Sequence, residues 1–270
     1  MLQHAGLVDD RGQRLNQDEG TTIKVVDVGF GCGDQTLYLT GSTFDERQKS
    51  HGRRPIVDEY VGLTINETQA EFARRRLLRA EQTRSVSSGK IQVFCADAAR
   101  PASWGLEATN AAQKTTSTTT TRTWVLGLDT LYHFRPSRQP LFTHAHDHLD
   151  ASIMAFDLLL SDSASLRDRA LLWAISLLAS TPFSNFVTRQ AYIDMLLRAG
   201  YARDDIEMYD VSEHVFAGIS TYMRRREAEI NPFGLSLGKY HRAGRLFGWW
   251  ATSGVVRGFI VVARTSSASK

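Results

Sequence analysis

Short apolar runs alternate with amphipathic stretches along most of this 270-residue chain. Glycine-rich or polar turns bound the runs, and apolar runs of this length between such turns are typical of buried strands. Strands are predicted at 23–28, 59–64, 91–95, 124–129, 152–160, 206–209 and 254–264. The stretches between them carry apolar residues at helical spacing. Helices are predicted at 34–39, 67–82, 138–149, 165–178, 188–199 and 212–230.

This alternation predicts an α/β fold, with a seven-stranded, mostly parallel, doubly wound sheet and helices on both faces. In that architecture, ligands bind beyond the carboxyl ends of the strands, where the strand order switches direction. The loop after the first strand is therefore the place to expect a ligand.

The chain is expected to form one domain over residues 23–265. A short polar segment, 1–22, precedes it and a polar tail, 266–270, follows. Residues 108–123 are rich in threonine and serine and have no apolar pattern, so a flexible surface insertion is predicted there.

Composition favours a protein of the cytoplasm that acts on a small molecule. The formal charge of +3, from 32 basic and 29 acidic residues, is too mild for a nucleic-acid binder. No apolar run approaches the roughly 18 residues that an integral membrane segment needs, and the start of the chain does not resemble a signal peptide.

Neither a disulfide framework nor a metal site is predicted. The two cysteines, Cys32 and Cys95, lie far apart in the sequence, which fits a reducing compartment. His144, His146 and His148 are spaced by two, so a helix spreads them around its circumference rather than gathering them on one face.

A glycine-rich loop follows the first strand, which itself contains Asp27. Gly29, Gly31 and Gly33 leave the backbone free of side chains near a helix start, where a ligand can approach closely. The third glycine comes one residue too early for the dinucleotide pattern, since Asp34 stands where that pattern has glycine. The spacing therefore disfavours a nicotinamide cofactor.

Residues 26–33, Val-Asp-Val-Gly-Phe-Gly-Cys-Gly, resemble the first motif of class I S-adenosylmethionine-dependent methyltransferases. The resemblance implies a Rossmann-like methyltransferase fold with S-adenosyl-L-methionine as cofactor. It also implies that Gly29, Gly31 and Gly33 contact the methionine moiety through their backbone. Asp27 would organise the loop through water or amides.

The end of the second strand, Gly-Leu-Thr at 62–64, is similar to a signature of cyclopropane fatty acid synthases and of sterol and tocopherol methyltransferases. This resemblance implies that Thr64 and Gln69 bind the cofactor ribose, in place of the acidic residue of many relatives. Residues 94–98 resemble the family motif at the end of the third strand. This resemblance implies that Asp97 faces the adenine amine and that Ala98 packs on the adenine ring. Gln69 as a surface residue and Asp97 as a turn former remain alternatives.

Residues 128–134 resemble the segment that lines the methyl-transfer centre. His133 is the candidate general base and Tyr132 the candidate for orienting the substrate or the sulfonium. Asp129 is the candidate partner of the cofactor amino group or of a substrate cation. The alternatives are a histidine satisfied by backbone groups and an aspartate in a turn. The arginines at 74–76 are expected on a solvated helix flank.

The predicted function is methyl transfer to a small natural-product or lipid-like acceptor, as in secondary metabolism. The alternatives are a methyltransferase-like protein that binds cofactor or a partner without turnover, and a nicotinamide-dependent oxidoreductase. Relatives usually carry a helical segment before the first strand, and only a short polar one stands here. Either a partner chain, as in a homodimer, or a C-terminal element such as 216–223 is then expected to close the site, or the chain is a shortened variant with an exposed cofactor. The aromatic stretch 247–250 is interpreted as core.

Overall fold

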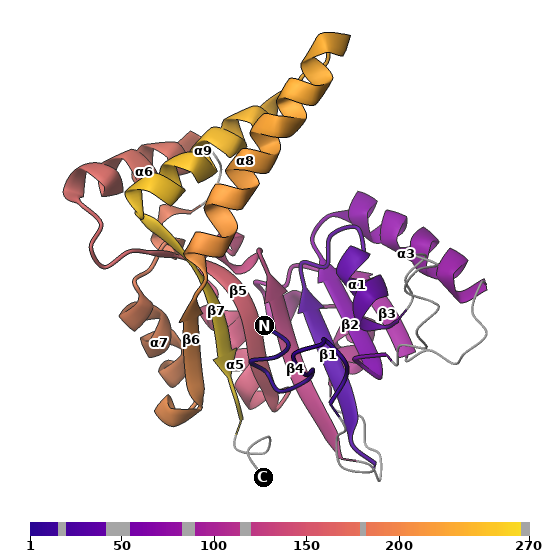
Figure 1. Cartoon of the computed structure of the whole chain (residues 1–270). Coiled ribbons are helices and arrows are strands. Elements are labelled where there is room, and N and C mark those ends of the chain that lie inside the picture. The colour runs from indigo at the N-terminus through magenta and orange to yellow at the C-terminus, as the bar shows by residue number, and fades with distance from the viewer. Residues whose placement is uncertain (16–19, 42–54, 83–89, 114–119, 179–181, 266–270) are drawn as a thin grey trace.

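The computed structural model describes residues 1–15, 20–41, 55–82, 90–113, 120–178 and 182–265. A seven-stranded sheet with the order β3-β2-β1-β4-β5-β7-β6 runs through the molecule (Figure 1). Its strands are β1 (Thr22–Val28), β2 (Glu59–Thr64), β3 (Lys90–Cys95), β4 (Thr121–Leu128), β5 (Ala151–Leu160), β6 (Ile206–Asp210) and β7 (Val256–Ala263).

Strands β1 to β5 pair in parallel, and β7 lies antiparallel between β5 and β6. The predicted mostly parallel, doubly wound sheet is therefore confirmed. From β1 the chain adds β2 and then β3 on one side of the sheet, and then β4 and β5 on the other side. This places the switch in strand order between β1 and β4, beside the glycine loop.

Helices cover both faces of the sheet, as predicted. They are α1 (Asp34–Leu39), α3 (Glu67–Gln82), α4 (Leu106–Ala112), α5 (Gln139–Asp147), α6 (Leu166–Leu178), α7 (Arg189–Arg198), α8 (Ser212–Ile230) and α9 (Lys239–Ser253). The bounds of α1, α3 and α8 agree with the predicted ranges, whereas α4 and α9 were not predicted.

Successive strand residues point to opposite faces and build two separate cores. Val26 and Val28 of β1 belong to the core that also contains residues of α4, α5 and α7. Val25 belongs to the opposite core, with residues of α1 and α3. Because both faces are covered, the strands read as continuous apolar runs in the sequence.

The N-terminal segment already belongs to the fold, which corrects the predicted start at residue 23. Ala5, Leu7 and Val8 are buried in the same core as Val25. The guanidinium of Arg264 donates a 2.6 Å hydrogen bond to the carbonyl of His4. In Figure 1 this segment crosses in front of β1 and β4. Its few apolar residues lack periodicity because it forms neither a helix nor a strand.

The predicted insertion at 108–123 is smaller than expected. Its first residues lie in α4, where Ala108 and Ala112 are buried, and its last residues belong to β4. Alanines are small enough to pack without an obvious apolar pattern. Residues 114–119 and the predicted tail at 266–270 lie outside the described residues.

Helices α8 and α9 form a hairpin that projects away from the sheet (Figure 1). A Cβ atom at Gly244 would lie 3.0 Å from Met223, and one at Gly248 would lie 2.9 Å from the Ser220 hydroxyl. These glycines let the two helices approach closely, although glycine weakens helix propensity, which is why α9 was not predicted. In the described part of the chain, no helix combines the length and the apolarity needed to cross a membrane.

A fully buried ion pair joins the start of α5 to β5. The Nε atom of Arg138 lies 2.9 Å from a carboxylate oxygen of Asp157, and neither side chain is exposed to solvent. Arg138 also donates to the carbonyl of Asn185 and lies over the Tyr192 ring. Burial raises the pKa of Asp157, and the charge of Arg138 opposes this rise.

We expect Arg138→Met to lower the free energy of unfolding by about 3–5 kcal/mol, because the substitution leaves Asp157 buried without its counter-ion. Urea denaturation followed by circular dichroism measures the change. The matched control is Arg189→Met, which alters an exposed arginine and should cost less than about 0.5 kcal/mol. Equal stability of the two variants would contradict this role for the ion pair.

Candidate functional site

The carboxyl ends of β1, β2, β3 and β4 meet at one edge of the sheet because these strands are parallel. Backbone bonds continue the alignment past the strand ends: Gly29 donates to the Leu63 carbonyl (2.7 Å) and Ala96 to that of Thr64 (2.8 Å). The predicted site residues lie on these four ends and their loops, except Gln69, which lies in the first turn of α3. They are Asp27, Gly29, Gly31, Gly33, Thr64, Gln69, Asp97, Ala98, Asp129, Tyr132 and His133.

The glycine loop needs its glycines for two different reasons. Gly29 has a φ of 94°, and a Cβ atom there would lie 2.5 Å from the Thr130 hydroxyl, so the loops after β1 and β4 touch at this point. Gly31 has a φ of 61°, and no atom of the described residues lies within 4 Å of where its Cβ would be. The backbone at Gly31 is thus open to a ligand. Gly33 stands at the N-cap of α1.

Asp27 is fully buried below this loop. One carboxylate oxygen accepts hydrogen bonds from the Tyr60 hydroxyl (2.5 Å) and from the Gln35 side-chain amide (2.6 Å). The other oxygen, Oδ1, has no hydrogen-bond partner among the described residues. Side chains of β2 and α1 therefore hold Asp27, where water or backbone amides were expected.

Tyr60 reaches Asp27 because of Gly62, which lies opposite Asp27 in the pairing of β1 with β2. A Cβ atom at Gly62 would lie 2.8 Å from the Phe30 ring and 3.1 Å from the Tyr60 ring. A glycine inside a strand marks such a close approach, but it does not identify Tyr60 as the partner of Asp27.

The pKa of Asp27 is raised to about 6, because burial disfavours the charged carboxylate more than the hydrogen bonds from Tyr60 and Gln35 favour it. Burial, together with the nearby Asp27 carboxylate, raises the pKa of Tyr60, so the tyrosine remains a hydroxyl donor.

Arg76 of α3 holds the glycine loop from outside. Its guanidinium donates to the carbonyl of Cys32 (2.9 Å) and to the Asp34 carboxylate (2.7 Å). The expectation of a purely solvated helix flank is wrong for this arginine. The contact could not be derived from periodicity because it joins residues more than forty positions apart.

At the end of β2, Thr64 and Gln69 are hydrogen-bonded to each other. The buried Thr64 hydroxyl donates to the Gln69 carbonyl oxygen at 3.1 Å. The side chain of Asn66 caps α3 by accepting from the Gln69 backbone amide. The side-chain amide nitrogen of Gln69 has no partner in the described part of the chain and is available as a donor.

Asp97 is half-buried after β3 and takes part in a turn. One of its carboxylate oxygens accepts from the Ala99 amide at 3.0 Å, and its carbonyl accepts from the Trp104 indole at 3.0 Å. The other oxygen lies 3.6 Å from Arg100. Ala98 is buried. Asp97 therefore stabilises a turn. Its second carboxylate oxygen makes no short hydrogen bond to the described residues.

The loop after β4 brings Asp129, Tyr132 and His133 together. The Tyr132 hydroxyl donates to Asp129 at 3.0 Å, and the rings of Tyr132 and His133 lie 4.2 Å apart. Asp129 has a φ of 57°, which few non-glycine residues adopt. Partial burial raises the pKa of Asp129 and lowers that of His133. The imidazole is thus neutral, and able to accept a proton, near neutral pH.

Asn185, which sequence reasoning missed, supports this loop from behind. Its side-chain amide donates to the carbonyls of Tyr132 (3.1 Å) and Phe134 (2.5 Å), while its own carbonyl accepts from Arg138. The buried ion pair of Arg138 with Asp157 therefore anchors the candidate catalytic segment. These contacts span about fifty positions of sequence, and no local pattern reveals them.

A continuous series of aromatic rings leads away from Tyr132. Tyr132 lies 6.4 Å from Phe186, Phe186 lies 6.2 Å from Trp250, and Trp250 lies 5.6 Å from Phe216. Phe216 of α8 and Trp250 of α9 are buried, so these rings form a packed core behind the candidate catalytic segment, and the prediction of core packing for the stretch 247–250 agrees with it.

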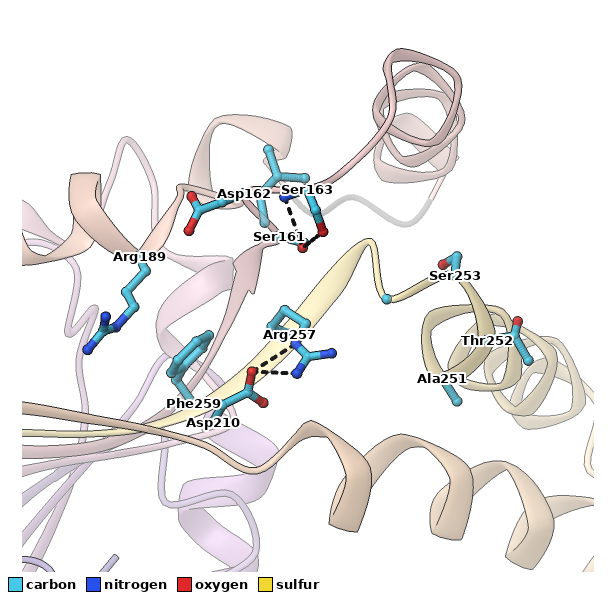
Figure 2. Close-up of a pocket in the computed structure, with 12 residues that line it drawn as sticks. Ser161, Asp162, Ser163, Arg189, Asp210, Ala251, Thr252, Ser253, Arg257 and Phe259 are labelled. Carbon is cyan, nitrogen blue, oxygen red and sulfur yellow. Dashed lines mark hydrogen bonds and ion pairs between the residues drawn. The ribbon is translucent and has the colours of Figure 1, made fainter.

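A polar cavity of about 620 Å³ lies at the β5-β7-β6 half of the sheet (Figure 2). Arg257 is paired with Asp210 there at 2.6 Å, and the Ser161 and Ser163 hydroxyls lie 3.0 Å apart. None of the predicted site residues lines it. Within the described residues there is also no cluster of three potential metal ligands, and His144, His146 and His148 form none.

No protein-family model and no curated protein sequence matches the chain. A cyclopropane synthase from Mycobacterium tuberculosis has a similar structure, with a TM-score of 0.57 and 15% identity over 90% of this chain and 79% of that chain. Phosphoethanolamine N-methyltransferase 2 from Haemonchus contortus, in complex with S-adenosyl-L-methionine, has a TM-score of 0.60 and 12% identity over 91% of this chain and 49% of that chain. The (4+2)-cyclase SpnF has a TM-score of 0.57 and 12% identity over 92% of this chain and 76% of that chain.

At these identities the likeness shows the fold alone. The chain has the Rossmann-like fold of S-adenosylmethionine-dependent methyltransferases, which includes structures of the branch that its sequence resembles. It spans about half the length of the Haemonchus enzyme.

The raised pKa of Asp27 predicts a pH dependence of stability. The folded chain takes up a proton at Asp27 near pH 6, whereas an unfolded aspartate does so near pH 4. Asp27 therefore lowers stability above pH 6, and this penalty disappears as the pH falls through that window.

Relative to the wild type, Asp27→Asn should gain about 2 kcal/mol in the free energy of unfolding between about pH 4.5 and pH 7.5, because the amide cannot ionise. Urea denaturation of both proteins at the two pH values measures this. A stability difference that does not change with pH would rule out the assigned pKa shift.

Proposed function

We propose that the chain binds S-adenosyl-L-methionine at the carboxyl edge of β1 to β4 and transfers its methyl group to a small, apolar natural-product or lipid-like acceptor. The observation that carries the proposal is the open backbone at Gly31, in the loop that follows the buried Asp27, together with the available amide of Gln69 after the neighbouring strand β2. It is supported by the fold, since the Haemonchus enzyme of the same fold binds this cofactor.

The donor set fits the cofactor. The glycine loop offers backbone amides close to a helix N-terminus, which suits the carboxylate of the methionine moiety. Gln69 can donate to a ribose hydroxyl, with Thr64 fixing its orientation. The Asp97 oxygen outside the turn can accept from the adenine amine, and Ala98 offers an apolar surface. Asp27 acts through Tyr60 and Gln35 to hold the loop in shape.

When bound, the cofactor supplies an electrophilic methyl group on a sulfonium. The protein then has to align the acceptor with that methyl group and, for a hydroxyl or amine acceptor, remove one proton. His133 accepts that proton on its neutral ring. Tyr132 and Asp129 lie next to His133. The hydroxyl of Tyr132 and the carboxylate of Asp129 can orient a polar group of the substrate.

The half-buried ring of Tyr132, which begins the aromatic series, offers an apolar surface to an acceptor at the candidate catalytic segment. The Mycobacterium structure of the same fold is a cyclopropane synthase, which agrees with a lipid-like substrate class.

A second candidate is cofactor binding without methyl transfer. The same fold occurs in a protein described as a (4+2)-cyclase, so the fold alone does not require methylation. A nicotinamide-dependent reaction has less support, because the buried Thr64 ends β2 where a dinucleotide site places an acidic residue.

Calorimetric titration of the full chain tests the cofactor. We expect S-adenosylmethionine and S-adenosylhomocysteine to bind and NADH not to bind. Gly31→Leu should abolish binding, since a side chain there fills the open space over the loop. The matched control is Gly234→Leu, at a glycine with a similar φ (71°) and equally open surroundings but far from the loop. Binding of neither adenosyl ligand by the wild type would refute the proposal.

His133→Gln should leave cofactor affinity unchanged and lower kcat at least about 100-fold for a hydroxyl or amine acceptor, because a glutamine accepts no proton. Release of S-adenosylhomocysteine across an acceptor panel measures turnover. His148→Gln, at the exposed C-cap histidine of α5, is the control and should behave like the wild type. Binding without turnover over the whole panel would favour the second candidate.

A further inference from the structure

The hairpin of α8 and α9 ends in an exposed apolar tip, residues 231–238. Phe233 is 79% exposed and Leu235 is 60% exposed, at the end of the hairpin farthest from the sheet (Figure 1). Most exposed apolar side chains of a soluble surface lie singly, whereas these two lie together on one projection.

The tip is an ordered turn. The Gly234 amide donates to the Asn231 carbonyl at 2.9 Å, and the Leu237 amide donates to the Glu227 carboxylate at 2.7 Å. The close packing at Gly244 and Gly248 also fixes the two helices against each other. Phe233 and Leu235 are therefore presented on a rigid support.

Positive charge surrounds the hairpin behind the tip. Arg224, Arg242 and Arg245 are exposed and have no ion-pair partner among the described residues. Arg224 and Arg245 line a groove of about 370 Å³ together with His241. The acidic groups nearby are already engaged: Glu229 pairs with Arg225 and Arg226, and Glu227 holds the tip turn.

The spacing of the two features matches the depth of a membrane interface. Arg224 lies six residues before the end of α8, which is roughly 9 Å along the helix axis. An apolar surface that enters a bilayer interface goes about 5–10 Å deep. Insertion of Phe233 and Leu235 therefore brings the groove arginines to the level of lipid phosphates.

We propose that the hairpin tip docks the protein on the surface of an anionic phospholipid bilayer. Phe233 and Leu235 enter the interface, while Arg224, Arg242 and Arg245 bind lipid phosphates. A second copy of the chain is a less suitable occupant, because tip-to-tip packing would bring the same unpaired arginines together. This docking site is separate from the proposed cofactor site and does not depend on it.

Sedimentation of the full chain with vesicles tests the proposal. We expect binding to vesicles of phosphatidylcholine with about 30% phosphatidylserine, and at least tenfold weaker binding to phosphatidylcholine alone. High salt should weaken the binding, since screening acts on the arginine contribution. Phe233→Ser with Leu235→Ser, and separately Arg242→Gln with Arg245→Gln, should each weaken binding to the anionic vesicles at least tenfold.

Two substitutions serve as matched controls. Leu106→Ser and Trp173→Ser alter apolar side chains that are 82% and 52% exposed on α4 and α6, and both should leave vesicle binding unchanged. Unchanged thermal melting of every variant shows that the fold is intact.

Failure of the wild type to bind anionic vesicles overturns the proposal. Loss of binding in Trp173→Ser, with retention in the tip variants, does so as well and moves the docking surface to α6. A dimer seen by light scattering that the tip substitutions dissociate, with no vesicle binding, would instead assign the tip to a second copy.

Discussion

Parallel pairing of β1 to β4 is the constraint on which the site depends. It forces four strand ends to one edge of the sheet, so that Asp27, Thr64, Asp97 and Asp129 become neighbours across about a hundred positions of sequence. The close contact between Gly29 and Thr130 then fixes the distance between the loops after β1 and β4. Neither loop can change its backbone without displacing the other.

Two buried carboxylates near this edge have different partners. Asp157 is held by a full counter-charge on Arg138, and that pair supports the segment of Tyr132 and His133 through Asn185. Among the described residues, Asp27 has only the neutral donors Tyr60 and Gln35, so its charge remains costly and its pKa rises. The first arrangement favours rigidity, whereas the second leaves a buried group that responds to pH.

The sequence was informative wherever one residue decides a local geometry. The strands and the glycine loop follow from periodicity and turn chemistry, and the structure agrees with the predicted strand bounds to within three residues. Contacts between distant segments were not predictable, as the bonds of Tyr60 to Asp27 and of Arg76 to Cys32 show. Helix α9 was missed because Gly244 and Gly248 read locally as helix-weakening, while their value lies in packing against α8.

The aromatic series between the hairpin and Tyr132 has a mechanical consequence. Phe216 of α8 and Trp250 of α9 both lie at the base of the hairpin, and Trp250 contacts Phe186, which contacts Tyr132. Closely packed interiors transmit strain rather than absorb it. A change in how the hairpin sits on the sheet would therefore be carried through these rings towards the ring of Tyr132.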